Sequence, residues 1–149
     1  MPTKSATDES AGFTADERAA MKERAAELRA EGKKGAKQAD GLQAVLDKIA
    51  AMAPEDRALA ERVHVAVTTT APALTPKTYY GMPAYANADG KVVVFFQDSG
   101  KFGARYSTLG FNDSANLDDG DFWPTSFALK DWSPEVEERV VALVRTATS

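Results

Sequence analysis

The sequence predicts an α+β fold, in which an antiparallel β-sheet connected as a meander packs against helices. Segments that favour helix fill most of the chain before residue 72, and a further one closes it after residue 133. Between them lie short apolar or aromatic segments separated by turn-forming residues. Helices followed by consecutive strands favour such a sandwich over alternating α/β layers. The expected order of elements is α-α-α-β-β-β-(β)-α.

The first helix is predicted from its start signal. Residues 1–12 are expected to form a disordered tail, because they are polar and show no apolar period. Thr14 and Glu17 then form a capping box, which predicts a helix that ends at about Glu31. Residues 32–37 hold two glycines among lysines and predict a flexible hinge. The apolar stripe of this helix is thin and consists of Met21, Ala25 and Leu28.

A thin stripe leaves two alternatives for this helix, since an isolated helix of its length is marginal in water. It docks on the second face of the sheet, against Val93 and Phe95, or it swings free and engages a partner. We favour docking, because a bare apolar strand face would be an exposed patch that invites association. The predicted organisation is a tail (1–12), a helix with its hinge (13–35) and an α+β domain (36–149).

Three further helices are predicted from apolar residues at helical spacing. The face of the second, over 40–53, comprises Leu42, Val45, Leu46, Ile49 and Met52. The third begins at Pro54, a residue tolerated in a first turn, and ends before Pro72, with a face of Leu59, Val63, Ala66, Val67 and Thr70. Ser133 and Pro134 start the closing helix, whose face is Val136, Val140, Leu143, Val144 and Ala147.

Strands are predicted between these helices, separated by the turn-forming runs 87–90 and 98–100. Their ranges are 77–80, 84–86, 91–97, 101–109 and, as a last addition, 125–129. The apolar run from Val92 to Phe96 does not alternate, which predicts a central strand covered on both faces. Gly81 and Pro83 lie inside an aromatic stretch, where we expect the strand to kink or to run along an edge.

Composition restricts the function. The chain has 149 residues, enough for one domain with a sizeable core. It contains no cysteine, which excludes disulfides, zinc–thiolate sites, iron–sulfur clusters and a cysteine nucleophile. A net charge of −4 argues against a surface that follows nucleic-acid phosphates. Without a membrane-length apolar run or a signal-peptide core, we expect a cytoplasmic protein that binds neither membranes nor nucleic acid.

Three motifs carry a family resemblance. They are Ala71-Pro72, then Tyr80-Gly81-Met82-Pro83-Ala84, then the run from Gly90 to Phe96. With these motifs, residues 42–147 resemble the YdhG-like family, domain of unknown function 1801 (DUF1801). The resemblance implies a small cytosolic α+β domain and, as in some members, frataxin-like intracellular iron handling. Pro76 stands where the family often has an acidic residue.

Residues suited to catalysis are few. His64 is the only histidine, and its place on the third helix, about 100° from the centre of the apolar face, predicts a half-buried structural role. No serine lies in a nucleophile-elbow pattern. We therefore expect a non-catalytic binding or accessory protein rather than an enzyme, with no cofactor except iron, which the resemblance implies.

Two groups of carboxylates are candidates for metal binding, because hard cations prefer oxygen ligands. The first lies in one loop whose spacing does not match a calcium loop, so we favour a solvated turn over a metal site; its members are Asp113, Asp118, Asp119 and Asp121. The second is implied by frataxin-like iron handling, although we favour a helix cap with a solvated face for it. It comprises Glu55, Asp56 and Glu61.

An aromatic cleft is the alternative site, in which rings supply apolar contact and a cation fixes an anion. Its candidates are Tyr80, Met82, Tyr85, Phe96, Lys101, Arg105 and Tyr106. This site predicts a small-molecule-binding protein or a cryptic enzyme. A nucleic-acid site at Lys33, Lys34 and Lys37 is disfavoured, because Glu23, Glu27, Glu31 and Asp40 flank it. The expected partner is a protein or a small ligand, and the expected state is a monomer or a homodimer.

Overall fold

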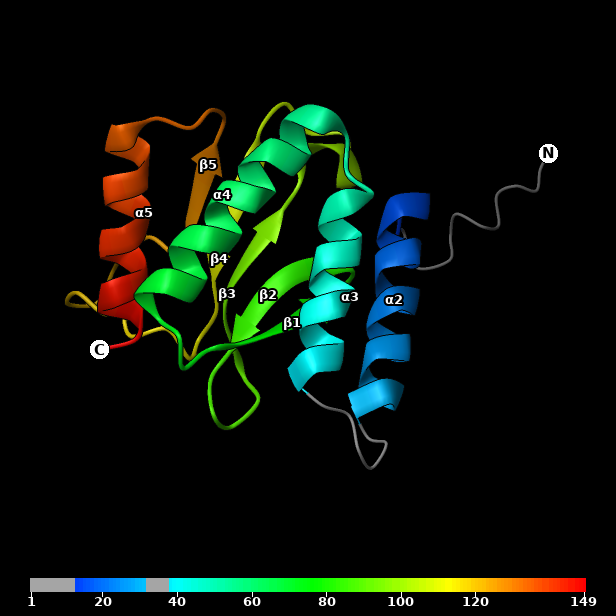
Figure 1. Ribbon diagram of the computed structural model, residues 1–149, viewed down its shortest axis with the longest axis horizontal. Helices are drawn as coiled ribbons and strands as arrows, with labels where there is room; N and C mark the ends of the chain where they lie inside the picture. The colour runs from blue at the N-terminus through cyan, green and yellow to red at the C-terminus, as the bar shows by residue number, and fades with distance from the viewer. Residues whose placement is uncertain (1–12, 32–37) are drawn as a thin grey trace.

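The computed structural model describes residues 13–31 and 38–149 and confirms the α+β fold class (Figure 1). The expected tail, and the expected hinge with Lys33, Lys34 and Lys37, lie outside the described residues. The helices are α2 (Ala15–Glu31), α3 (Gln38–Ala50), α4 (Pro54–Thr70) and α5 (Pro134–Ala147). The strands are β1 (Thr75–Tyr79), β2 (Met82–Ala86), β3 (Val92–Gln97), β4 (Ser107–Phe111) and β5 (Ser126–Leu129). No helix of the described ranges combines the length and apolarity needed to cross a bilayer.

The sheet is an antiparallel meander in the order β1-β2-β3-β4-β5. β3 is its central strand, as the unbroken apolar run predicted. The strand predicted over 101–109 is wrong in its first half, because Ser99–Lys101 form a short 3₁₀ turn, η2, and β4 begins at Ser107. Gly103, with φ +67°, lies in the left-handed region, which extended backbone does not use.

The aromatic stretch around Gly81 forms a hairpin rather than a kinked strand. Tyr79 pairs with Met82, so a turn of two residues joins β1 to β2. Tyr80 has φ 52° and Gly81 has φ 79°. Two positive φ values are what a type I′ turn requires, and this turn matches the twist of the flanking strands. Gly81, whose conformational freedom predicted a kink, therefore forms part of the turn.

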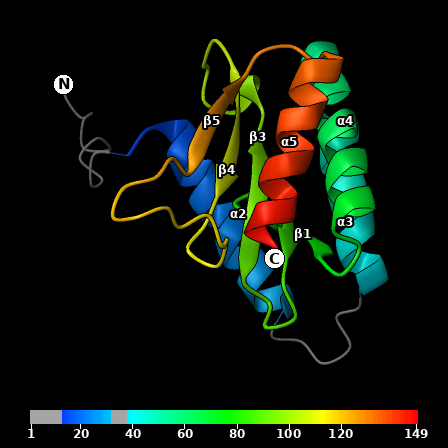
Figure 2. The same cartoon turned by 90° about the vertical axis from the view of Figure 1, so that its left-hand side faces the viewer.

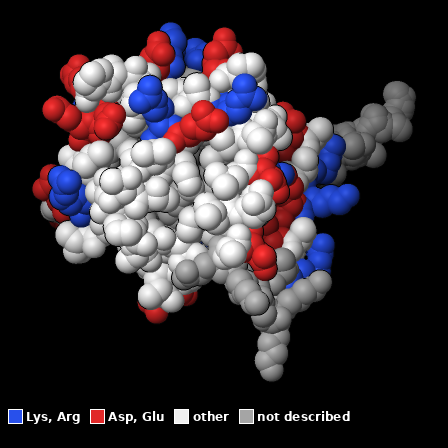
Figure 3. Space-filling model, viewed as in Figure 1, with Lys and Arg blue, Asp and Glu red and all other residues white. Residues whose placement is uncertain are grey.

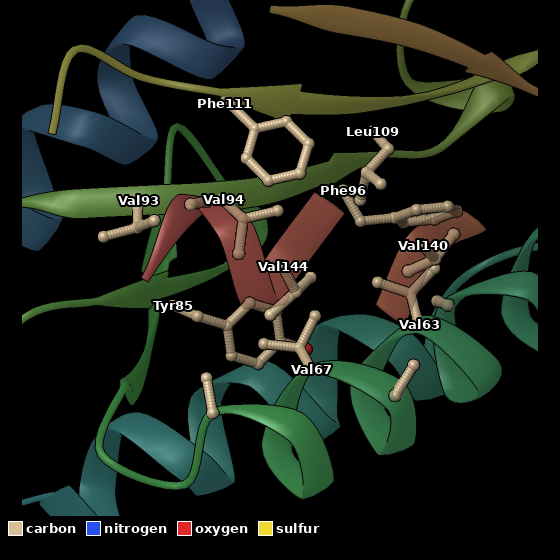
Figure 4. Close-up of a cluster of buried hydrophobic side chains, with 14 of the residues drawn as sticks. Val63, Val67, Tyr85, Val93, Val94, Phe96, Leu109, Phe111, Val140 and Val144 are labelled. Carbon is tan, nitrogen blue, oxygen red and sulfur yellow. The ribbon is translucent and has the colours of Figure 1, made fainter. Parts of the chain in front are cut away.

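Helices cover both sides of the sheet. Figure 2 shows α3 and α4 on one side of the strands and α2 on the other. The main core lies between the strands and the helices α4 and α5, where Tyr85, Val94 and Phe111 occupy aligned positions on β2, β3 and β4. Phe96 and Leu109 extend this layer toward the α4 and α5 side chains Val63, Val67, Val140 and Val144 (Figure 4).

Replacing Gly81 by valine is expected to destabilise the domain by about 1 to 3 kcal/mol, the usual cost of a strained backbone position. Valine resists φ near +79°, and a Cβ there would overlap the carboxylate of Glu23. Gly90→Val is the matched control, because Gly90 has φ +80° but open space around its Cα. Chemical denaturation of both variants should show the larger loss for Gly81→Val. Equal losses would mean that the Glu23 contact adds nothing to the backbone strain.

Candidate functional site at the β1–β2 turn

The polar face of α2 contacts the rest of the domain. Ala20, Glu23, Arg24 and Glu27 recur at the spacing of one helical face, and Ala20 is buried. The predicted apolar stripe is wrong as the docking face, since Met21 is 38% exposed and Leu28 is 52% exposed. The helix is instead held by groups that attract carboxylates. In Figure 3 acidic side chains form a band over α3 and α2, whereas the broad face over α4 shows few charges.

The carboxylate of Glu27 binds the backbone of the hairpin turn. Its Oε1 accepts the Tyr80 N–H at 2.8 Å and its Oε2 accepts the Gly81 N–H at 2.8 Å. Successive N–H groups of left-handed turn residues form a concavity that binds anions. The turn is therefore an anion site by its backbone alone, and Glu27 occupies it.

The carboxylate of Glu23 lies beside the same turn and contacts two lysines. Lys48 Nζ from α3 is 2.6 Å from Oε2, and Lys101 Nζ from η2 is 2.9 Å from Oε1. Partial burial opposes ionisation, but the hydrogen bonds and charges of the two lysines outweigh it and lower the pKa of Glu23. Glu23 is thus a carboxylate at neutral pH.

Arg24 lies between the two glutamates along α2 and faces the rings of β1 and the turn. Its guanidinium carbon is 5.0 Å from the Tyr79 ring centroid and 5.8 Å from that of Tyr80. It also forms an ion pair with Glu27 at 3.5 Å. The Tyr79 ring packs in turn against Phe95, with centroids 5.7 Å apart. The first helix is therefore docked, and it approaches the second sheet face through Tyr79. Val93, which was expected to contact it, belongs instead to the main core.

Lys101 is held in place from the opposite layer by Asp56. The Asp56 carboxylate is buried and accepts hydrogen bonds from Ser99 Oγ at 2.8 Å and from the Gly100 N–H at 3.1 Å. Ser107 Oγ lies 3.4 Å from the same group. Asp56 therefore fixes η2 instead of lying on a solvated face, which corrects the sequence interpretation of this residue.

The contact between α2 and the rest of the domain is mostly polar and therefore contributes only modestly to stability. A hydrogen bond to a charged group contributes about 1.5 to 3 kcal/mol, and a partly exposed ion pair contributes about 0 to 1 kcal/mol. Lys48 and Glu23 keep 41% and 31% of their side-chain surface exposed. Ordering the side chains opposes these gains. The contact should therefore be worth a few kcal/mol and weaken as salt increases.

The seven residues of the predicted aromatic cleft do not share a cavity. Tyr80 and Lys101 lie at the α2 contact, whereas Tyr85 and Phe96 are buried in the main core. Met82 is buried on the opposite face of β2 from Tyr85. Arg105 and Tyr106 lie before β4, with the guanidinium carbon of Arg105 5.1 Å from the Tyr106 ring centroid. Two cavities of about 430 and 550 Å³ are lined by none of the seven.

His64 has the half-buried place that the sequence predicted. Its Nδ1 lies 2.8 Å from the Tyr85 hydroxyl, which the core would otherwise leave without a partner. Burial lowers the pKa of His64 and raises that of Tyr85, so both side chains are neutral at pH 7. This geometry supports a structural pair.

The loop carboxylates proposed for metal binding all lie exposed: Asp113, Asp118, Asp119 and Asp121. Across residues 13–31 and 38–149, no three His, Cys, Asp or Glu side chains converge on a cation site. The candidate metal site in this loop therefore has no shared centre among the described residues.

Sequence reasoning identified Tyr80 and Lys101 but missed Glu23, Glu27 and Lys48. The available signal was the spacing of the two glutamates, four residues apart on one helix face with Arg24 between them. As a sequence pattern, these glutamates indicate only charges that dilute the field of the neighbouring lysines.

Comparison of the chain with protein-family models, curated proteins and solved structures finds no match. Membership of the YdhG-like family therefore stays a prediction, and the functional argument depends on the geometry of the β1–β2 turn.

Proposed function

We propose that this protein is a non-catalytic binding protein and that it recognises carboxylates at the β1–β2 turn. One observation carries the proposal: a single carboxylate accepts both turn N–H groups, while two lysines from separate elements hold a second carboxylate beside it. The cytoplasmic location expected from the sequence is part of the same proposal.

The donors of this site belong to the body of the domain and not to the helix that fills it. The two N–H groups come from the β1–β2 turn, Lys48 comes from α3, and Lys101 comes from η2. The turn is held by the pairing of β1 with β2, and η2 is held by Asp56. A preformed set of donors requires little reorganisation when it binds an anion.

The other candidate functions have less support. The aromatic-cleft function requires Tyr85 and Phe96 at a ligand surface, but each is at most 1% exposed. Iron handling, which the family resemblance implies, requires converging carboxylates, and the described residues hold no such group of three. The carboxylates of Glu23 and Glu27 are bound by cations and N–H donors, which is the opposite of a cation site.

Removal of one carboxylate tests the proposal by chemical rescue. In the full chain, Glu27→Ala leaves the Tyr80 and Gly81 N–H groups without the carboxylate and keeps a strong helix former in α2. We expect sodium propionate to shift the Tyr80 and Gly81 amide resonances of this variant saturably toward their wild-type positions. The wild-type protein should not respond, because Glu27 already fills the site.

Propionamide and sodium chloride at equal ionic strength are the controls for this titration, since neither supplies a carboxylate. Glu61→Ala is the matched variant, because Glu61 is an exposed glutamate on α4. A response of the Glu27→Ala variant that is the same for chloride and propionate would contradict carboxylate recognition.

A further inference from the structure

Resting on the proposed function, we propose that the ligand of the β1–β2 turn is an acidic helix of another protein. The helix would present the pattern Glu-Arg-x-x-Glu, and α2 would be the resident copy that occupies its place. In α2 the pattern comprises Glu23, Arg24 and Glu27.

The spacing of the donors fits a helix better than a small anion. Residues four apart on a helix lie on one face, one turn apart. The N–H pair of the turn holds the carboxylate of Glu27, and the two lysines hold that of Glu23. A single carboxylate fills one of these places, whereas a helix with this pattern fills both.

The arginine of the pattern contacts a separate pair of aromatic rings. The guanidinium of Arg24 faces the rings of Tyr79 and Tyr80, which meet edge to face with centroids 4.8 Å apart. A cation over a tyrosine face is a specific contact that an acidic residue cannot make. The rings therefore distinguish Glu-Arg-x-x-Glu from a uniformly acidic helix.

Apolar residues of α2 contribute little to its docking on the domain. Met21 and Leu28 are exposed while α2 is docked, and Ala20 is the buried apolar residue of the face. Release of α2 would uncover the Tyr79 and Tyr80 rings but little apolar surface of the helix itself, and we expect the donors of the turn, α3 and η2 to remain in place. This is the behaviour required of a helix that exchanges with a partner.

Competition with α2 determines how strongly the wild-type protein should bind a partner helix. An alternative state a few kcal/mol above the ground state is populated at about 0.1 to 10%. The apparent affinity of a competing helix is reduced by the fraction of protein in which the site is free. Wild-type protein should therefore bind such a helix roughly 10- to 1000-fold more weakly than a variant whose α2 cannot occupy the site.

The experiment uses a fluorescent synthetic peptide with the sequence of residues 15–31 and measures its anisotropy with the full-length protein. The receptor is the full chain carrying both Glu23→Ala and Glu27→Ala, and circular dichroism checks its fold. The Glu27→Ala variant of the rescue experiment takes its place if the double variant does not fold. We expect the variant to bind the peptide at least about 10-fold more tightly than wild type.

Two controls make the result specific to the pattern. A peptide with Gln in place of Glu23 and Glu27 should not bind to the receptor variant. The original peptide should not bind when Lys48→Ala and Lys101→Ala are added to that variant. Equal binding of the Glu and Gln peptides, equal binding by wild type and variant, or no binding by the variant would each overturn the inference. If propionate still rescues Glu27→Ala in such a case, the proposed function stands and the helical partner fails. If propionate also fails, the proposed function fails as well.

Discussion

Phe96→Ala is expected to lower the free energy of unfolding by about 3 to 5 kcal/mol, the usual cost of deleting a buried phenylalanine side chain. Phe96 is 0% exposed on the central strand, and its ring packs among residues of β4, α4 and α5. Domains of this kind have a total stability of about 5 to 15 kcal/mol, so the variant should be near the limit of folding.

Urea denaturation of Phe96→Ala measures this loss, and Phe122→Ala is the matched control. Phe122 is 94% exposed, so its removal should change the free energy of unfolding by less than about 0.5 kcal/mol. Similar midpoints for the two variants would show that the core does not depend on Phe96.

Asp56→Ala is expected to cost about 2 to 3 kcal/mol, because a buried donor left without its acceptor costs about 1 to 3 kcal/mol. The Asp56 carboxylate accepts from Ser99 Oγ and from the Gly100 N–H. Some of the loss is offset, because burial and then the Asp56 charge raise the pKa of the neighbouring Asp98. Removing Asp56 relieves that repulsion.

Thermal and urea denaturation measure this effect, with the exposed Asp113→Ala as control. Asp56→Asn keeps one acceptor oxygen and should lose less than Asp56→Ala. The amide resonances of Tyr80 and Gly81 supply a second readout, because Asp56 holds η2 and η2 carries Lys101. An Asp56→Ala variant as stable as Asp113→Ala would refute the role of Asp56.

Apolar periodicity predicted the buried faces of α4 and α5, whereas on α3 it was wrong for Leu42 and Leu46, which are 38% and 40% exposed. Val63 and Val67 on α4, and Val140 and Val144 on α5, are buried at the predicted positions. The capping box of Thr14 and Glu17 is present, with bonds of 2.9 and 3.0 Å. These signals are local, so one stretch of chain is enough to predict them.

The candidate site was less predictable, because its partners are distant in sequence. Glu27 binds a turn 53 and 54 residues away, and Glu23 binds Lys101, 78 residues away. A polar face that binds backbone N–H groups has the same sequence pattern as a solvated one. The two-residue turn between β1 and β2 was missed because Tyr80 adopts φ 52°, which a tyrosine rarely does.

The order of the strands in the sheet determines which parts of the domain unfold together. Every strand pairs with the next one along the chain, so the sheet closes through local connections, of which the longest spans residues 112–125. The bonds from Glu27 to the turn instead span more than 50 residues and involve little apolar area. Elements with few apolar contacts open locally at the lowest free energy. We therefore expect α2 to open as a separate cooperative unit, with every strand pair of the meander left intact.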